Sequence, residues 1–134
     1  MNRLLQLPLQ LAGLLFLSWS PLQSQTVSLD TFQEVQLLNI HNCAVVQVNA
    51  SWNYKNRVKI EKVSNLCHVA EIDIENKTIG ATIAKEWDIS IVPTIIVLKN
   101  GKEVKRFQAD ISFAMKATKK DVQEIIDEIL MDQF

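Results

Sequence analysis

The chain has 134 residues, of which 48% are hydrophobic and 22% are charged, and its formal net charge at pH 7 is −1. This is the composition of one globular domain, and with only 3 glycines and 3 prolines it excludes collagen-like and proline-rich architectures. The near-neutral charge gives no electrostatic reason to expect nucleic acid or an anionic membrane as a partner. Two cysteines are too few for a disulfide-dense miniprotein.

Residues 1–24 have the pattern of a secretory signal peptide. A short polar start with Arg3 precedes an apolar stretch whose uninterrupted part, 11–17, is shorter than the roughly 20 residues that span a bilayer. Pro21 ends this stretch, and Ser24 is a small residue before an expected cleavage. We therefore expect residues 25–134 to form the mature domain, exported to the extracellular space, the periplasm or the secretory lumen. An uncleaved anchor is the alternative.

Hydrophobic periodicity in residues 25–134 alternates between the periods of helix and strand. In chain order it predicts a short strand near 26–27, a helix beginning at 28–33, a strand at 44–48, a helix at 54–66, a strand at 69–74, a helix at 77–87, a strand at 94–98, a turn at 100–101, a strand at 103–107 and a helix after 118. Asp30 with Gln33, and Thr118 with Asp121, have the spacing of N-terminal caps. This order predicts an α/β fold with a mainly parallel sheet and an antiparallel hairpin at its edge.

Three segments make residues 25–134 resemble the thioredoxin-like fold family. Residues 45–52 are similar to the strand and turn that lead into the thioredoxin active site, and 88–94 to the approach to the family's cis-proline. Residues 95–104 are similar to the terminal hairpin. The resemblance implies a three-layer sandwich, with a mixed sheet of four to five strands, helices on both faces, and a cis Val92–Pro93 bond before the antiparallel hairpin.

The groups that carry the family's redox chemistry are replaced in this chain. Where the resemblance implies Cys-x-x-Cys after Trp52, the sequence has Asn53-Tyr54-Lys55-Asn56, and amides cannot attack a disulfide. The family's buried acid is matched by Gln47, and its usual aromatic residue by Asn49. We interpret 53–56 as a pseudo-active site with no catalytic residue, metal or cofactor, and predict a redox-inactive protein.

The surface implied by the resemblance predicts a binding function. In the family, backbone groups beside the cis-proline pair with an extended partner chain. We expect Trp52, Val92 and Pro93 to form such a groove, with Phe113 bordering it from an insertion at 109–117. The predicted protein is a monomeric module that binds an extended peptide or a partner protein, without membrane contact after signal cleavage. A vestigial groove, with an insertion that only covers the sheet edge, is the alternative.

The two cysteines have a separate expected role. The resemblance places Cys43 and Cys67 at the starts of adjacent parallel strands and matches Gln47 with Glu71. Counting back four residues on each strand sets the cysteines side by side, within reach of a disulfide. We therefore predict a structural disulfide at the end of the sheet opposite residues 53–56.

Three other roles for the cysteines stay open at this point. They could be buried free thiols. With His41 and His68 they could form a metal site, although the spacing matches no standard zinc pattern. Cys43 and Cys67 could also support an atypical thiol-disulfide oxidoreductase, which would need an accessible thiol of low pKa.

Two segments match the N-glycosylation sequon. Asn76-Lys77-Thr78 is predicted in an exposed loop and is the better candidate, whereas Asn49-Ala50-Ser51 follows a buried strand.

Overall fold

The computed structural model describes residues 26–60, 63 and 66–132, so the predicted signal segment 1–24 lies outside the described residues. Its elements are β1 (Val27–Ser28), α2 (Phe32–Gln36), η1 (Leu37–Ile40), β2 (Cys43–Asn49), η2 (Ser51–Asn56), β3 (His68–Asp73), α3 (Gly80–Glu86), β4 (Thr94–Lys99), β5 (Lys102–Gln108) and α4 (Lys119–Met131). No helix in the described part of the chain is long and apolar enough to span a membrane.

The five strands form one mixed sheet in the order β1-β3-β2-β4-β5. β1, β3 and β2 are parallel neighbours, whereas β4 runs antiparallel to β2 and pairs with β5 in an antiparallel hairpin. Gln47 stands opposite Glu71, which is the predicted register. The predicted α/β class and antiparallel edge are therefore confirmed.

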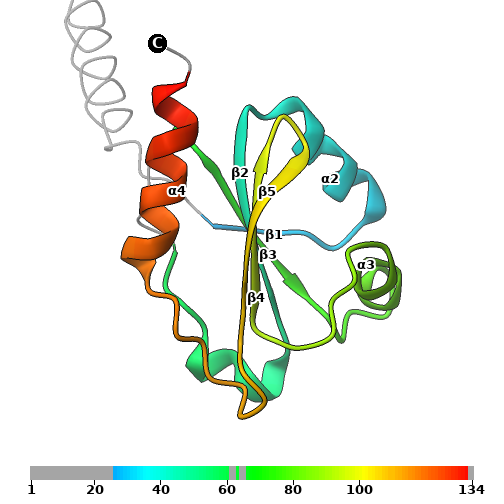
Figure 1. The fold of residues 1–134 in the computed structure, drawn as a ribbon. Helices are drawn as coiled ribbons and strands as arrows, with labels where there is room; N and C mark the ends of the chain where they lie inside the picture. The colour runs from blue at the N-terminus through cyan, green and yellow to red at the C-terminus, as the bar shows by residue number, and fades with distance from the viewer. Residues whose placement is uncertain (1–25, 61–62, 64–65, 133–134) are drawn as a thin grey trace, which may run out of the picture.

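Helices cover both faces of the sheet, so the predicted three-layer sandwich is also confirmed (Figure 1). Alternate residues of β2 point to opposite faces because the side chains of a strand alternate. Ala44, Val46 and Val48 join the core beneath α2 and α3. Cys43 and Val45 join the other core, which contains the buried face of α4.

The predicted helix at 54–66 is wrong. η2 is a short 3-10 helix over Ser51–Asn56, and the described residues that follow it are not helical. The physical reason is the buried side chain of Gln47, whose Nε2 donates to the Val58 carbonyl (2.7 Å) and whose Oε1 accepts from the Val58 N–H (2.9 Å). This segment still contributes Ile60 and Val63 to the core, which explains its apolar periodicity.

The predicted first cap is also wrong by one residue. Thr31, not Asp30, caps α2, because its hydroxyl oxygen accepts from the Glu34 N–H (3.2 Å). The predicted cap of the last helix is confirmed. There the Thr118 hydroxyl accepts from the Asp121 N–H, and the Asp121 carboxylate accepts from the Thr118 N–H (2.7 Å).

The terminal hairpin is as predicted. The Val92–Pro93 bond is cis and directly precedes β4. Asn100 and Gly101 both have positive φ (52° and 80°), which is the backbone of the tight turn that joins two antiparallel strands.

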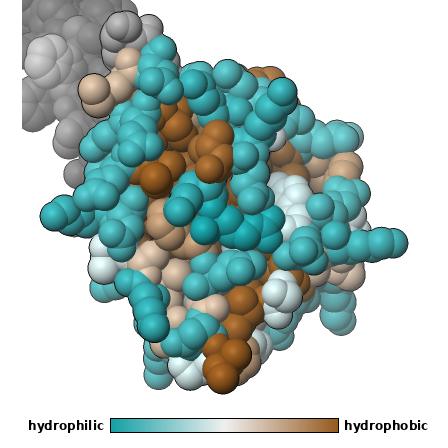
Figure 2. All heavy atoms as spheres, viewed as in Figure 1, coloured by the Kyte–Doolittle hydropathy of each residue, from teal (hydrophilic) through white to brown (hydrophobic). Residues whose placement is uncertain are grey.

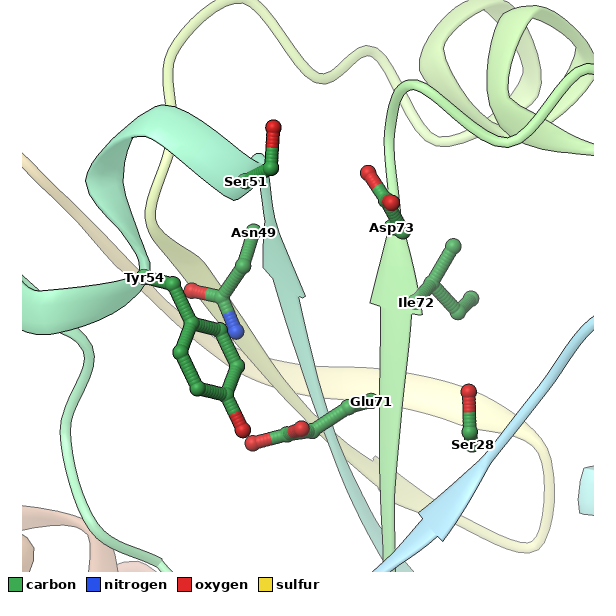
Figure 3. Close-up of a pocket in the computed structure, with 7 residues that line it drawn as sticks. All are labelled: Ser28, Asn49, Ser51, Tyr54, Glu71, Ile72 and Asp73. Carbon is green, nitrogen blue, oxygen red and sulfur yellow. The ribbon is translucent and has the colours of Figure 1, made fainter.

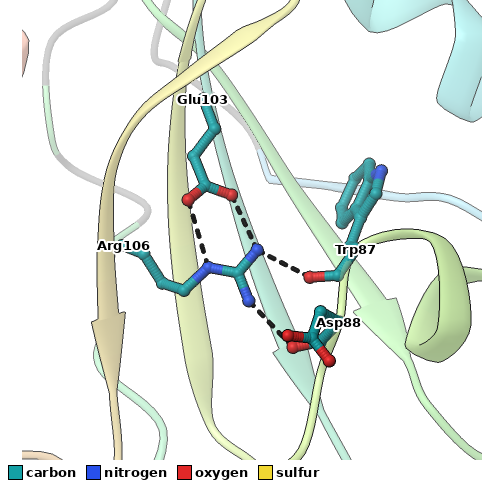
Figure 4. A network of polar contacts seen from close by, with 4 residues as sticks. All are labelled: Trp87, Asp88, Glu103 and Arg106. Atoms are coloured by element: carbon teal, nitrogen blue, oxygen red, sulfur yellow. Dashed lines mark hydrogen bonds and ion pairs between the residues drawn. The ribbon is translucent and has the colours of Figure 1, made fainter.

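Arg106 of β5 fixes the loop that leads to this cis bond (Figure 4). Its guanidinium donates to the backbone carbonyls of Trp87 (2.6 Å) and Asp88 (3.0 Å) and pairs with Glu103 (2.7 Å). A bidentate, charge-assisted contact of this kind restrains the chain direction after α3. The segment that ends in Pro93 is therefore held against the sheet edge.

Candidate functional site

Residues 53–56 start at the point where β2 ends, but the first of them points inward. Asn53 is only 1% exposed, and its Oδ1 accepts from the Ala50 N–H (2.7 Å). The Asn53 N–H in turn donates to the Ala50 carbonyl (3.2 Å). Asn53 therefore stabilises the start of η2 and offers no reactive group to solvent.

The rest of the predicted pseudo-active site lies on the surface. Tyr54, Lys55 and Asn56 are exposed, and the guanidinium of Arg57 stacks over the Tyr54 ring, 4.2 Å from its centroid. These side chains supply a phenol, an ammonium and an amide, none of which can exchange with a disulfide.

Trp52 and Phe113 form an exposed aromatic pair. Their ring centroids are 4.8 Å apart and their planes meet at 83°, an edge-to-face contact. Trp52 is 59% exposed and Phe113 is 41% exposed. The insertion at 109–117 therefore lies beside Trp52. Figure 2 shows hydrophobic atoms at this end of the molecule.

Asp110 shapes the turn that presents Phe113. Its carboxylate accepts from the Ser112 hydroxyl and from the N–H groups of Ser112 (2.8 Å) and Ala114 (3.2 Å). These bonds, the Ser112 hydroxyl first, lower the pKa of Asp110 below its ordinary value. Phe113 itself has positive φ (62°), so this turn holds an aromatic residue in an uncommon conformation.

The cis-proline is joined to the same surface through the backbone. The Ala109 N–H donates to the Pro93 carbonyl (3.0 Å), which places the insertion beside Pro93. Val92 is 6% exposed, so its side chain belongs to the core and only its backbone can serve a groove. Within the described part of the chain, no residue forms a hydrogen bond with the Val92 N–H or carbonyl.

The opposite end of the sheet holds the disulfide. Cys43 and Cys67 are bonded, with Cα atoms 4.7 Å apart, and both are almost fully buried. The predicted pairing is therefore present. The disulfide rules out the alternative of buried free thiols. Among the described residues, no group of three or more side chains could hold a metal ion.

His41 and His68 lie beside the disulfide strands as a stacked pair. Their rings are parallel within 2°, with centroids 4.2 Å apart. Partial burial, and secondarily the nearby His41, lower the pKa of His68. The sequence placed the two histidines at the same edge of the sheet, but it did not predict that their rings stack, because stacking depends on side-chain packing in the folded protein.

The structure also has a pocket that the sequence did not predict. Its volume is about 490 Å³, and it lies where β1, β3 and β2 meet η2 (Figure 3). The sequence placed Asn49 at the end of a buried strand, but whether its amide would find hydrogen-bond partners depends on tertiary contacts.

Solved structures with the same fold include several thioredoxins, at low sequence identity. A point-mutant thioredoxin from Halobacterium salinarum is 12% identical, with a TM-score of 0.63 over 82% of this chain and 95% of that one. A Malassezia sympodialis thioredoxin is 17% identical, with a TM-score of 0.62 over 81% and 93%. A thioredoxin from Nicotiana alata is 20% identical, with a TM-score of 0.56 over 81% and 96%.

These likenesses define the class of fold. No protein-family model and no curated protein sequence matches the chain. The protein has a thioredoxin-like α/β fold with an internal Cys43–Cys67 disulfide.

Proposed function

We propose that this protein is a redox-inactive binding module that holds an extended peptide, or an extended segment of a partner protein. The observation that carries the proposal is the exposed edge-to-face pair of Trp52 and Phe113 beside the cis Val92–Pro93 bond. Large aromatic residues that remain exposed on a folded domain are common anchors of binding surfaces.

The backbone beside Pro93 supplies the second part of the proposed site. The Val92 N–H and carbonyl have no hydrogen-bond partner within the described residues. An extended chain that pairs with Val92 would satisfy both groups, while its side chains contact Trp52 and Phe113. This is strand addition, in which main-chain hydrogen bonds provide affinity and side-chain contacts provide specificity.

The chemistry of the same end supports binding over catalysis. The position after Trp52 is taken by the buried, hydrogen-bonded amide of Asn53. Both cysteines lie at the other end of the sheet and are bonded to each other. An extended partner would therefore meet aromatic and backbone groups and no thiol.

We also propose that the module is exported and works as a monomer after removal of residues 1–24. The Cys43–Cys67 disulfide supports export, because such bonds persist in oxidising compartments.

The binding proposal predicts that Trp52→Ala weakens partner capture without unfolding the protein. Peptides selected from a phage-displayed library on the full chain should bind Trp52→Ala about tenfold more weakly or worse. Because Trp52 is 59% exposed, the free energy of unfolding should change by only about 0.5 kcal/mol. Ile40→Ala, which removes a 75% exposed apolar side chain elsewhere, is the matched control. Equal capture by Trp52→Ala would contradict the proposed site.

A redox role through Cys43 and Cys67 is the second candidate function, and the disulfide itself favours it. The two sulfurs are nearly inaccessible, since Cys43 is 2% and Cys67 is 3% exposed. We therefore expect insulin reduction with dithiothreitol to proceed no faster with the wild type than with the double variant Cys43→Ala, Cys67→Ala. Turnover above that variant would replace the binding proposal with the redox one.

A further inference from the structure

The pocket of about 490 Å³ lies between η2 and the parallel strands (Figure 3). Asn49 shares its face of β2 with Cys43 and Val45, which belong to the core that contains α4. Its volume is within the range of small-molecule sites. Polar side chains from four elements line most of it: Ser28, Asn49, Ser51, Tyr54, Glu71 and Asp73.

The side chain of Asn49 is the unusual feature of this pocket. Asn49 is 4% exposed, and among the described residues neither its Oδ1 nor its Nδ2 has a hydrogen-bond partner. Figure 3 shows this amide directed into the space between Tyr54 and Glu71. Leaving a buried amide oxygen without a partner is costly, so its retention points to a ligand that donates to Oδ1.

The strand register gathers acidic groups around the same amide. Asn49 stands opposite Asp73, and Glu71, two residues earlier on the same strand, stands opposite Ser28 of β1. Partners in register point to one face, so both carboxylates lie on the face of Asn49. Arg57 pairs with Glu71 at 3.5 Å, but none of the described residues that line the pocket is basic.

This lining selects for a ligand that donates hydrogen bonds and carries positive charge. The hydroxyls of Ser28 and Tyr54, the amide oxygen of Asn49 and the two carboxylates are all acceptors. The charge of Glu71 is balanced by Arg57, but an anion would still be repelled by Asp73. A planar cation with several N–H groups can reach acceptors from more than one strand.

We propose that this pocket binds a compact organic cation, a guanidinium or a primary ammonium group, with Asn49 and Asp73 as the main contacts. The cation can be a free small molecule or the basic side chain of a bound peptide. The site does not depend on the proposed function, because none of its residues belongs to the surface of Trp52, Phe113 and Pro93.

The test is a titration of the full chain with butylguanidinium, followed by the side-chain and backbone amide signals in NMR spectra. Its uncharged analogue butylurea is the matched control probe. We expect saturable shifts at Asn49, Ser51 and Asp73 with butylguanidinium and none with butylurea. Absence of saturable shifts up to about 20 mM, which corresponds to negligible affinity, would overturn the proposal.

Two variants make the result specific to the pocket. Asn49→Leu keeps the size of the side chain but removes its polar atoms, and it should weaken binding by roughly tenfold or more while leaving thermal stability equal or higher. Asp73→Asn removes the charge but keeps an oxygen that can accept from the Glu75 N–H, so it tests the site even where Asn49→Leu does not fold. Unchanged affinity in either folded variant would overturn the assignment.

A glycine-flanked arginine peptide distinguishes the two sources of the cation. If the pocket takes the side chain of a bound peptide, this peptide should bind more tightly than butylguanidinium. Trp52→Ala should then lower the affinity of the peptide to that of butylguanidinium. Equal affinity, insensitive to Trp52→Ala, assigns the pocket to a free small molecule. If the binding-module proposal fails, Asn49→Leu should still weaken the binding of butylguanidinium. Failure of the binding-module proposal is therefore distinguishable from failure of the pocket proposal.

Discussion

Gln47 shows how one residue changes both the chemistry and the backbone of this fold. Its position in the sequence is that of the acid expected from the thioredoxin resemblance, and a glutamine cannot take up a proton there. Fully buried, it instead donates to and accepts from the backbone of Val58. These two bonds satisfy an amide that would otherwise be costly in the core, and they hold the chain in the irregular path that follows η2.

At the same scale, the stacked histidines predict a dependence of stability on pH. The pKa of His68 is lowered below its ordinary 6.5 by burial and then by His41. As the pH falls, His68 therefore takes up its proton in the unfolded chain before it does so in the folded protein. The free energy of unfolding is at its full value above pH 6.5 and decreases as the pH falls below 6.5. The decrease ends once the pH is below the lowered pKa of the folded protein.

Chemical unfolding at a series of pH values from about 7 downwards checks this expectation, because the histidine of the unfolded chain takes up its proton near the ordinary pKa. His68→Gln should flatten the fall in the free energy of unfolding. His41→Gln is the matched variant, and it should flatten the fall only in part, since burial of His68 remains the larger cause. Identical profiles for wild type and His68→Gln would contradict the prediction.

Among the larger elements, the insertion at 109–117 is held by its first turn. The carboxylate of Asp110 accepts three hydrogen bonds from Ser112 and Ala114, and the Ala114 carbonyl accepts from the Asp110 N–H (2.9 Å). The turn orients Phe113 against Trp52. The carboxylate of Asp110 thus stabilises the turn that carries Phe113 beside the proposed groove.

Removal of this carboxylate should detach Phe113 from Trp52. We expect Asp110→Ala to lose the contacts between the two rings in NMR spectra and to weaken peptide capture, because the turn loses all three acceptor bonds. Asp110→Asn keeps an acceptor oxygen and should retain most of the contact. Equal ring contacts in Asp110→Ala and wild type would show that the turn forms without the carboxylate.

The whole molecule separates its stabilising bond from its proposed binding surface. The disulfide joins the first residue of β2 to the residue before β3, whereas Trp52 follows the other end of β2. The seven residues of β2 separate the two ends by roughly 20 Å, so neither sulfur contacts the proposed surface.

Loss of the disulfide should therefore reduce stability without removing binding. The cysteines are 24 residues apart, and in the chain-entropy account a loop of this size contributes roughly 3 kcal/mol. The double variant Cys43→Ala, Cys67→Ala should lose about this amount in urea unfolding while it captures peptides as the wild type does. The intact mass of exported protein, alkylated with and without reduction, checks both the bond and cleavage after residue 24. Labelling without reduction would contradict the bond.

Several features of the fold could be predicted because their signals are local. The runs at 44–48, 69–74 and 94–98 are strands because apolar and β-branched residues of this length suit a sheet covered on both faces. The turn at 100–101 needs two residues that tolerate positive φ, and Asn-Gly supplies them. The disulfide required one further step, the register of β2 against β3 that the thioredoxin resemblance implied.

The errors and omissions share one cause, since each depends on a partner that is distant in sequence. The segment after η2 has helical periodicity, but Gln47, 11 residues before Val58, takes the backbone groups that a helix would use. The Asp30 carboxylate, expected to cap α2, accepts instead from Asn76, 46 residues away (3.3 Å). Such competition between local and distant hydrogen bonds cannot be read from spacing alone.

The sequence by itself determined the α/β class, the strands, the antiparallel hairpin and the absence of a Cys-x-x-Cys motif, because apolar periodicity and residue chemistry are properties of the chain. The cis Val92–Pro93 bond was implied by the resemblance to thioredoxins. Tertiary structure alone decided that Phe113 meets Trp52, that His41 stacks on His68, and that the Asn49 amide is buried without partners among the described residues. Those contacts form only when strand register and chain crossings bring distant segments together, and register is set by packing of the whole sheet.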